Sequence, residues 1–245
     1  MDPATSLRIL SSLLCTIQPD WRELLEKKDE CHLVTFFNPF SLKQYIEEER
    51  FRSDVHEMDL LFADGILLSK VSSWITDKII PRLAFDGNSI ALDVLKSASE
   101  LSMSIGLVGG KPGEPDLATQ KLKAHGIDVA YFHHGYLSGE QRQQVLRDVA
   151  STVDVLIVGM GAPLQEAFLV DLKSLGWKGK GFTCGAYISQ IAARGPRYYP
   201  DIINRLHLRM FYRLIHEPDK LLLRYSTGYL PFYKGSLRLT MNGWK

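Results

Sequence analysis

The chain has 245 residues, of which 45% are hydrophobic and 23% are charged. This apolar content is enough for a sizeable core, and a formal net charge of +1 is too small for a disordered chain. The three cysteines are spaced neither as a disulfide framework nor as a zinc site, which favours a reduced, cytosolic protein. No run of about 18 apolar residues occurs, so we expect no membrane-spanning helix.

Short apolar runs rich in β-branched and aromatic residues alternate with amphipathic segments up to about residue 194. Apolar side chains at helical spacing predict a helix over residues 7–17 rather than a signal peptide. The alternation predicts an α/β fold with a Rossmann-like, mainly parallel sheet and helices on both faces. The predicted strands are 33–37, 58–63, 104–108, 129–133, 153–158 and 181–184, and the predicted helices between them are 41–51, 89–103, 115–125, 138–150 and 163–175.

The charges are distributed unevenly along the chain. Residues 1–193 contain 19 Lys and Arg against 25 Asp and Glu, whereas residues 194–245 contain 10 against 3, so their net charges are −6 and +7. Such a basic end favours an anionic partner, which is a phosphate-bearing ligand, a nucleic acid or a membrane surface. We therefore expect one α/β domain over residues 1–193 and a basic, aromatic C-terminal appendage over residues 194–245.

Polar residues and glycines follow several predicted strands. In a parallel sheet these strand ends meet at one edge, where ligands bind. Asn38 follows the first strand, Asp64 the second, Gly109 the third and Gly159 the fifth. Asp64 is the only carboxylate that directly follows a predicted strand, which makes it the candidate general base, although Asp-Gly is also a common turn dipeptide.

The glycines after the third and fifth strands have two interpretations. They allow backbone N–H groups to approach a phosphate at a helix N-terminus, or they only form tight turns. Leu164 stands where the third glycine of a dinucleotide-binding G-x-G-x-x-G motif belongs, and the chain has no P-loop motif. Gln165 and Glu166 fall in the first helical turn that follows, near any ligand bound there, although Glu at this position also complements the helix dipole.

No metal site is predicted. His133 and His134 follow the fourth strand, but no acidic or cysteine partner lies at a ligand spacing from them. In the basic end, Arg213 and Lys220 share one face if the segment is helical, and Arg224 follows them. These cations either meet a diphosphate or form a solvated basic surface. Apolar and aromatic residues alternate with them, and such a mixture suits the headgroup region of an anionic bilayer.

Six short motifs follow one another in a fixed order over roughly residues 30–225. They are Thr35…Asn38-Pro39, Ala63-Asp64-Gly65, Gly109-Gly110-Lys111-Pro112-Gly113, His134-Gly135-Tyr136, Val158-Gly159-Met160-Gly161-Ala162-Pro163-Leu164-Gln165-Glu166 and Phe211-Tyr212-Arg213-Leu214…Glu217-Pro218…Arg224-Tyr225. In this order and spacing the chain resembles the WecG/TagA/CpsF family of bacterial glycosyltransferases.

The resemblance implies an inverting, metal-independent transfer of a sugar from a nucleotide donor to a sugar linked to a polyprenyl diphosphate. No cofactor is implied, and the chain lacks the D-x-D pair of Mn²⁺- or Mg²⁺-dependent sugar-nucleotide enzymes. By this resemblance Asp64 is the catalytic base. The implied donor-binding residues are Thr35, Asn38, Gly109, Gly135, Gly161, Gln165 and Glu166, and the implied diphosphate- or acceptor-binding residues are Arg213, Lys220 and Arg224.

The chain departs from the family pattern at several positions. Ser189 stands where an Asp is common, and Lys220 replaces an Arg, which removes bidentate binding of a phosphate. The segments Cys184-Gly185 and Tyr198-Tyr199-Pro200 resemble the xanthan- and acetan-type exopolysaccharide branch, which implies glucose as the donor sugar. The alternative is the branch that transfers N-acetylmannosamine from its UDP form to teichoic acid or enterobacterial antigen-type glycolipids.

The implied partners are a UDP-sugar donor, a polyprenyl-diphosphate-linked acceptor and an anionic membrane that the protein contacts peripherally, with no nucleic acid. The implied location is the cytoplasmic face of the bacterial inner membrane. Two other classes stay open. The first is a nucleotide-dependent oxidoreductase. Only the glycine turns in an α/β sheet support this interpretation, and the missing dinucleotide motif argues against it. The second is a nucleic-acid-binding module. The basic end of the chain supports this interpretation, but nucleic-acid binding would not explain the motifs at the strand ends.

Overall fold

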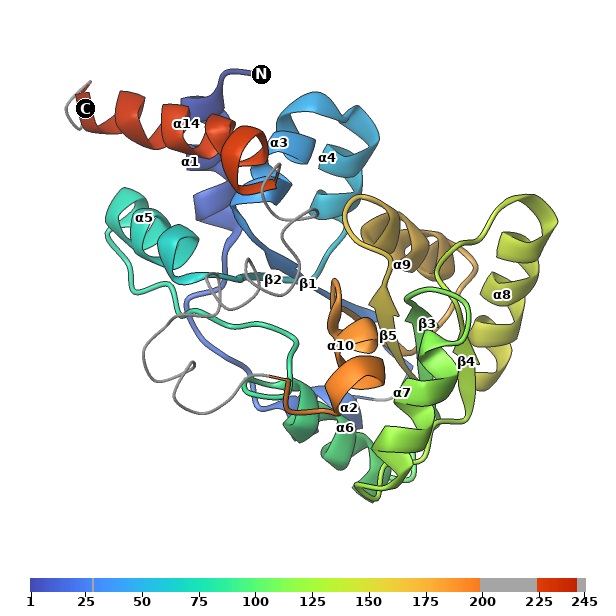
Figure 1. Cartoon of the computed structure of the whole chain (residues 1–245). Coiled ribbons are helices and arrows are strands. Elements are labelled where there is room, and N and C mark those ends of the chain that lie inside the picture. The colour runs from blue at the N-terminus through green and yellow to red at the C-terminus, as the bar shows by residue number, and fades with distance from the viewer. Residues whose placement is uncertain (28, 199–223, 242–245) are drawn as a thin grey trace.

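The computed structural model describes residues 1–27, 29–198 and 224–241 of the chain. Its centre is a sheet with the strand order β2-β1-β6-β5-β3-β4, in which every neighbouring pair is parallel (Figure 1). This confirms the predicted α/β class. The strands are β1 (His32–Phe37), β2 (Leu60–Ala63), β3 (Ile105–Gly109), β4 (Tyr131–His133), β5 (Val155–Gly159) and β6 (Lys180–Thr183).

Helices cover both faces of the sheet, because alternate residues of each strand point to opposite sides. In β5, Leu156 and Val158 contribute to one core cluster, whereas Val155 and Ile157 contribute to the other. The first cluster packs against α1 (Pro3–Leu13), α3 (Pro39–Glu47), α4 (Glu49–His56), α5 (Ile66–Thr76), α8 (Gly139–Thr152), α9 (Leu164–Ser174) and α14 (Leu230–Met241). The second packs against α2 (Trp21–Glu26), α6 (Ala91–Glu100), α7 (Glu114–Lys123) and α10 (Tyr187–Arg194).

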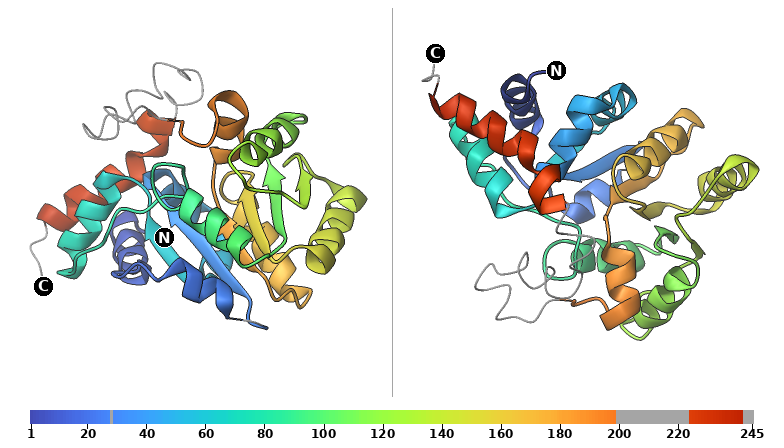
Figure 2. Two further views of the ribbon diagram at one scale, coloured as in Figure 1. Left: turned by 90° about the horizontal axis from the view of Figure 1, so that it is seen from below. Right: turned by 45° about the horizontal axis from the view of Figure 1, so that its top comes forward.

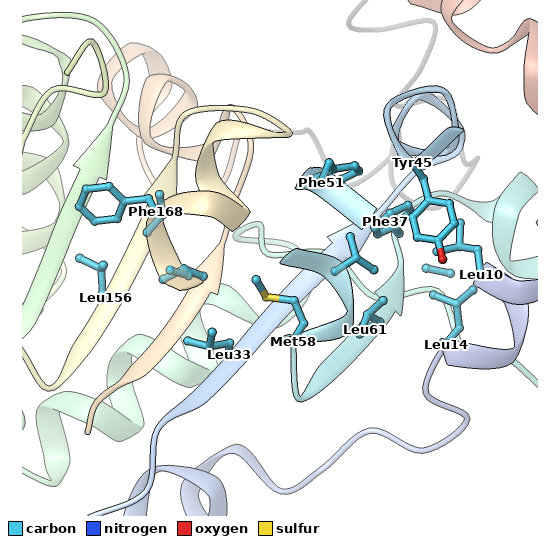
Figure 3. Close-up of a cluster of buried hydrophobic side chains, with 14 of the residues drawn as sticks. Leu10, Leu14, Leu33, Phe37, Tyr45, Phe51, Met58, Leu61, Leu156 and Phe168 are labelled. Carbon is cyan, nitrogen blue, oxygen red and sulfur yellow. The ribbon is translucent and has the colours of Figure 1, made fainter. Parts of the chain in front are cut away.

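Aromatic side chains fill the core beside β1. Phe37 stacks on Phe51 of α4 with a centroid distance of 5.7 Å, and the ring of Tyr45 meets it edge-on at 6.4 Å (Figure 3). All three are almost completely buried. Burial of a large apolar side chain stabilises a fold by about 1.5–3 kcal/mol, so this group fixes α3 and α4 against the end of β1.

The helices α5 and α14 both pack on α1. The α1–α5 crossing is close because small residues meet there, and Ser11 Oγ donates to Ser72 Oγ at 2.9 Å. The α1–α14 crossing is close at Gly235, where a Cβ would lie 2.8 Å from the carbonyl oxygen of Pro3. Arg238 of α14 also forms an ion pair with Asp2, the N-cap of α1. The described end of the chain therefore packs onto the α/β core, while the predicted domain boundary at residue 193 stays a prediction.

The sequence predicted most elements correctly, but it misread several. The predicted helix 41–51 is two helices, α3 and α4, because Glu48 between them has extended dihedral angles. The N-terminal helix ends at Leu13 rather than reaching residue 17. Helices α2, α5, α10 and α14 were not predicted at all.

We predict that Gly235→Ala destabilises the protein. Ala normally stabilises a helix relative to Gly by about 1 kcal/mol, but here the added Cβ would collide with the backbone of Pro3 and displace α14. Overpacking of this kind typically costs about 1–3 kcal/mol. Urea denaturation of Gly235→Ala, with Ser236→Ala in the same helix as control, measures the effect. A Gly235→Ala protein as stable as the parent would refute the close crossing.

Candidate active site

A cavity of about 1180 Å³ opens at the carboxyl edge of the sheet. Residues that follow each of the six strands form its walls, and Tyr229 and Tyr233 reach it from the C-terminal end of the chain. Helices α3, α5, α9 and α10 all start at this edge (Figure 1). Their N-terminal dipoles therefore point toward the cavity, which favours an anionic ligand.

Asp64 lies at the rim beside a guanidinium. Its backbone N–H donates to the carbonyl oxygen of Phe37 at 2.6 Å, which fixes the turn after β2. Arg82 Nη2 lies 3.9 Å from Asp64 Oδ1 and 3.8 Å from Asp86 Oδ2. The side chain of Asp64 is 40% exposed and that of Asp86 is only 12% exposed. Of the two carboxylates near Arg82, Asp64 is therefore the more accessible.

Arg82 and Asp86 line the cavity, and the sequence analysis missed both. Arg82 reaches the site because the chain there forms a parallel bridge with Ala63, the last residue of β2. The N–H of Leu83 also donates to the carbonyl oxygen of Ala63 at 3.0 Å. A signal existed, since Phe85-Asp86-Gly87 repeats the pattern of an apolar run followed by Asp-Gly that singled out Asp64.

A buried polar network lies under the cavity. Glu166 Oε1 accepts a hydrogen bond from Thr35 Oγ1 at 2.9 Å and another from Gln165 Nε2 at 3.0 Å. The hydroxyl oxygens of Thr35 and Thr183 are 3.0 Å apart. The other carboxyl oxygen of Glu166 is buried and has no hydrogen-bond partner among the described residues. Burial raises the pKa of Glu166 above its usual value, although the hydrogen bonds from Gln165 and Thr35 oppose this shift.

Glu166 fixes the orientation of Gln165, which does line the cavity. The amide nitrogen of Gln165 donates to Glu166, and its oxygen accepts from the N–H of Gly185 at 3.2 Å. Both ends of the amide are thus held by the protein, which fixes this side chain at the wall of the cavity.

The glycines at the strand ends serve backbone packing. A Cβ on Gly109 would lie 2.5 Å from the carbonyl oxygen of Gly159, and one on Gly135 would lie 3.0 Å from the Cα of Gly109. Two of the backbone N–H groups already form hydrogen bonds within the protein. Gly110 N–H donates to the carbonyl oxygen of Gly159, and Gly135 N–H donates to the carbonyl oxygen of Gly110. Gly161 differs: a Cβ there meets nothing, but its φ of +77° favours glycine. Close packing therefore accounts for Gly109 and Gly135, and conformation accounts for Gly161.

The structure brings the predicted base, Asp64, and four of the seven predicted donor-binding residues to one cavity. Asn38, Gly135, Gly161 and Gln165 line it with Asp64, whereas Thr35 and Glu166 lie under its floor and Gly109 packs behind Gly159. Asn38 also has a local role, since its Oδ1 caps α3 by accepting from the N–H of Phe40 at 3.0 Å. The binding roles of all these residues stay predictions.

The predicted diphosphate-binding residues are mostly beyond the described ranges. Arg213 and Lys220 lie outside them, and only the backbone of Arg224 is described, at the start of a π-helix (Arg224–Gly228). Among the described residues, Arg82 and Lys111 are the cations that line the cavity. No group of three or more His, Cys, Asp or Glu side chains suited to a metal gathers in that part of the chain.

A parallel sheet with an accessible carboxylate and a guanidinium in a large cavity at its carboxyl edge is typical of the active site of an α/β enzyme. The chain belongs to the glycosyl transferase WecG/TagA/CpsF family, whose model matches residues 16–244. It is therefore a glycosyltransferase, as its motifs predicted. It is 36% identical over 200 residues to a UDP-Gal:alpha-D-GlcNAc-diphosphoundecaprenol beta-1,4-galactosyltransferase of Shigella boydii, and the match covers 80% of this chain and 82% of that protein.

We predict that Glu166→Gln makes the stability of the protein less dependent on pH. Because the pKa of Glu166 is raised in the folded state, the folded protein holds this proton at pH values where the unfolded chain, with the ordinary value of 4.5, has lost it. Wild-type stability from this group is therefore highest below pH 4.5 and falls as the pH rises above it. A glutamine side chain does not ionise, so the variant does not lose stability in this way as the pH rises. Its amide oxygen still accepts the hydrogen bond from Thr35.

Urea denaturation at pH 5 and pH 7.5 tests this, with exposed Glu140→Gln as control. We expect Glu166→Gln to gain stability relative to the parent on going from pH 5 to pH 7.5. If the free energies of unfolding of the two proteins differ by the same amount at both pH values, the raised pKa of Glu166 is contradicted.

Proposed function

We propose that the protein transfers a hexose from a UDP-sugar to a sugar carried on a polyprenyl diphosphate. The observation that carries the proposal is the accessible carboxylate of Asp64, held at the rim of the cavity beside Arg82. The name of the Shigella boydii relative, with its UDP-Gal donor and its GlcNAc-diphosphoundecaprenol acceptor, supports both substrate classes.

In the proposed reaction, Asp64 removes the proton from the acceptor hydroxyl as that oxygen attacks the anomeric carbon of the donor. The bond from this carbon to the diphosphate breaks, and UDP leaves with its electron pair. A single displacement inverts the anomeric carbon. The relative's name supports this stereochemistry, because inversion of an α-configured UDP-hexose gives a β linkage such as the one printed there.

The leaving UDP requires stabilisation of negative charge. We propose that the chain supplies it without a metal. Arg82 and Lys111 line the cavity, and the N-termini of α9 and α10 point toward it. Arg213, Lys220 and Arg224 are the further cations proposed for this role from the family motif.

The proposed donor is a UDP-hexose. The resemblance to the xanthan- and acetan-type branch implies glucose and exopolysaccharide synthesis, while the relative's name gives galactose. UDP-N-acetylmannosamine is the alternative donor. We further propose that the protein works as a peripheral protein at the cytoplasmic face of the bacterial inner membrane. Within the described ranges, no helix has both the length and the apolar character needed to cross a bilayer.

We predict that Asp64→Asn lowers turnover by about 10²–10⁴-fold, because general base catalysis typically contributes that much. The assay is transfer of radiolabel from UDP-galactose, UDP-glucose or UDP-N-acetylmannosamine to polyprenyl-diphosphate-linked N-acetylglucosamine or glucose. Asp128→Asn is the control, since Asp128 is highly exposed and does not line the cavity. Near-normal turnover of Asp64→Asn would refute its role as the base.

We predict that the same transfer is unchanged after dialysis against EDTA. Arg82 lies between the two carboxylates of Asp64 and Asp86, where a metal-dependent site would place a divalent cation. Turnover with EDTA, measured against turnover with added Mg²⁺ or Mn²⁺, tests this. A loss that either cation restores would show that the reaction needs a metal.

A further inference from the structure

Two helices that start at the cavity carry exposed apolar side chains. Ile66 and Leu67, in the first turn of α5, line the cavity and are each 41% exposed. Leu230 begins α14, and Tyr233, one turn later, also lines the cavity. The mouth of the cavity is thus bordered by apolar residues from both helices.

The apolar residues continue along both helices away from the cavity. In α14, Leu230, Tyr233, Leu237 and Met241 are spaced i, i+3, i+7 and i+11, so they form one stripe, and Met241 is 76% exposed. In α5, exposed Trp74 lies seven residues after Leu67, and Ile79, just after the helix, is 85% exposed. Among the described residues, these two segments hold eight of the fifteen exposed large hydrophobic side chains.

Each of the two helices buries one apolar face in the core and exposes a second apolar face to solvent. Phe232 and Gly235 of α14 and Leu68 and Ile75 of α5 are all buried. Both helices pack on α1, and Figure 2 shows them on the same side of the molecule. An exposed apolar patch of this kind marks an interaction surface.

The charges on the two segments favour an anionic partner. Lys70, Lys78 and Lys234 are exposed there, whereas Asp77 is the exposed carboxylate among them. Arg238 is already neutralised by its ion pair with Asp2. A second copy of the chain on a two-fold axis would bring these lysines together, but anionic lipid headgroups complement them.

We propose that the exposed faces of α5 and α14 dock on an anionic lipid membrane. We also propose that the lipid chain of the acceptor leaves the cavity between the first turns of these two helices. The second part rests on the proposed function, because only a lipid-linked acceptor needs such an exit. This arrangement assigns the half of the cavity beside Asp64 to the acceptor and the half beside Gly110, Gly135 and Gly161 to the donor.

Vesicle sedimentation tests the docking surface. The probe is vesicles of equal parts phosphatidylglycerol and phosphatidylcholine, and the variant is Ile79→Asp with Leu237→Asp, two exposed positions that do not line the cavity. We expect at least a tenfold weaker affinity than for the parent. Leu117→Asp is the matched control, because Leu117 is 48% exposed on α7, a helix on the other face of the sheet, and it should bind as the parent does.

Charge reversal provides a second variant. Lys70→Glu with Lys234→Glu leaves the apolar faces intact, and we expect it to lose the preference for phosphatidylglycerol over pure phosphatidylcholine vesicles. Vesicle binding by either variant at the parent's level would overturn the proposal. So would a parent dimer in light scattering that Ile79→Asp with Leu237→Asp converts to a monomer, since the faces would then join two copies.

Transfer assays separate the lipid exit from the proposed function. With an acceptor on a short, water-soluble lipid diphosphate, the Ile79→Asp, Leu237→Asp protein should match the parent, since its cavity is unchanged. With a long-chain acceptor embedded in the vesicles, its rate should fall at least tenfold. Equal rates on the embedded acceptor would overturn the exit. Absence of transfer by the parent to any acceptor would refute the proposed function, while the vesicle assay would still decide the docking surface.

Discussion

Parallel pairing of all six strands is the constraint on which the site depends, because it brings every strand's carboxyl end to one edge. β1 is central to this arrangement. Its last residue, Phe37, pairs with Ala63 and accepts the hydrogen bond that fixes the turn at Asp64. On its other side β1 pairs with β6, which brings Thr183 within hydrogen-bonding distance of Thr35, above Glu166 of α9. The rim carboxylate and the buried network beneath the cavity thus depend on the same strand.

The sequence located the parts of the site that come directly after apolar runs. Asp64 and Gln165 follow buried strands at short distance, so strand prediction alone placed them at the edge of the sheet. Arg82 and Asp86 were missed because they lie in an irregular segment without strand periodicity, and a single bridge to Ala63 brings Arg82 to the site. The glycines at 109 and 135 were recognised, but the sequence does not show which backbone approaches them. Their packing against neighbouring strand ends is visible only in three dimensions.

The four missed helices differ in what they expose. In α5 and α14 the solvent face carries Leu67, Tyr233 and Leu237, while the inner face is apolar as well. Such departures from a soluble pattern are expected where function imposes a second requirement on the same residues. Neither α2 nor α10 exposes a large apolar side chain, yet both were also missed, so the exposed patch does not account for the missed helices.

The proposed docking surface and the proposed base are connected through the start of α5. Gly65 is the N-cap of this helix and has a φ of +111°, a conformation that favours glycine, and Asp64 directly precedes it. The helix is held at the other side by its serine contact with α1. Asp64, the proposed base, lies two positions before the first residue of α5. In the proposed arrangement α5 rests on the bilayer, so docking fixes the height of Asp64 above the membrane surface. A sugar on a membrane-anchored diphosphate can reach only a limited height. The depth at which α5 and α14 sit in the headgroup region therefore decides whether the acceptor hydroxyl meets Asp64.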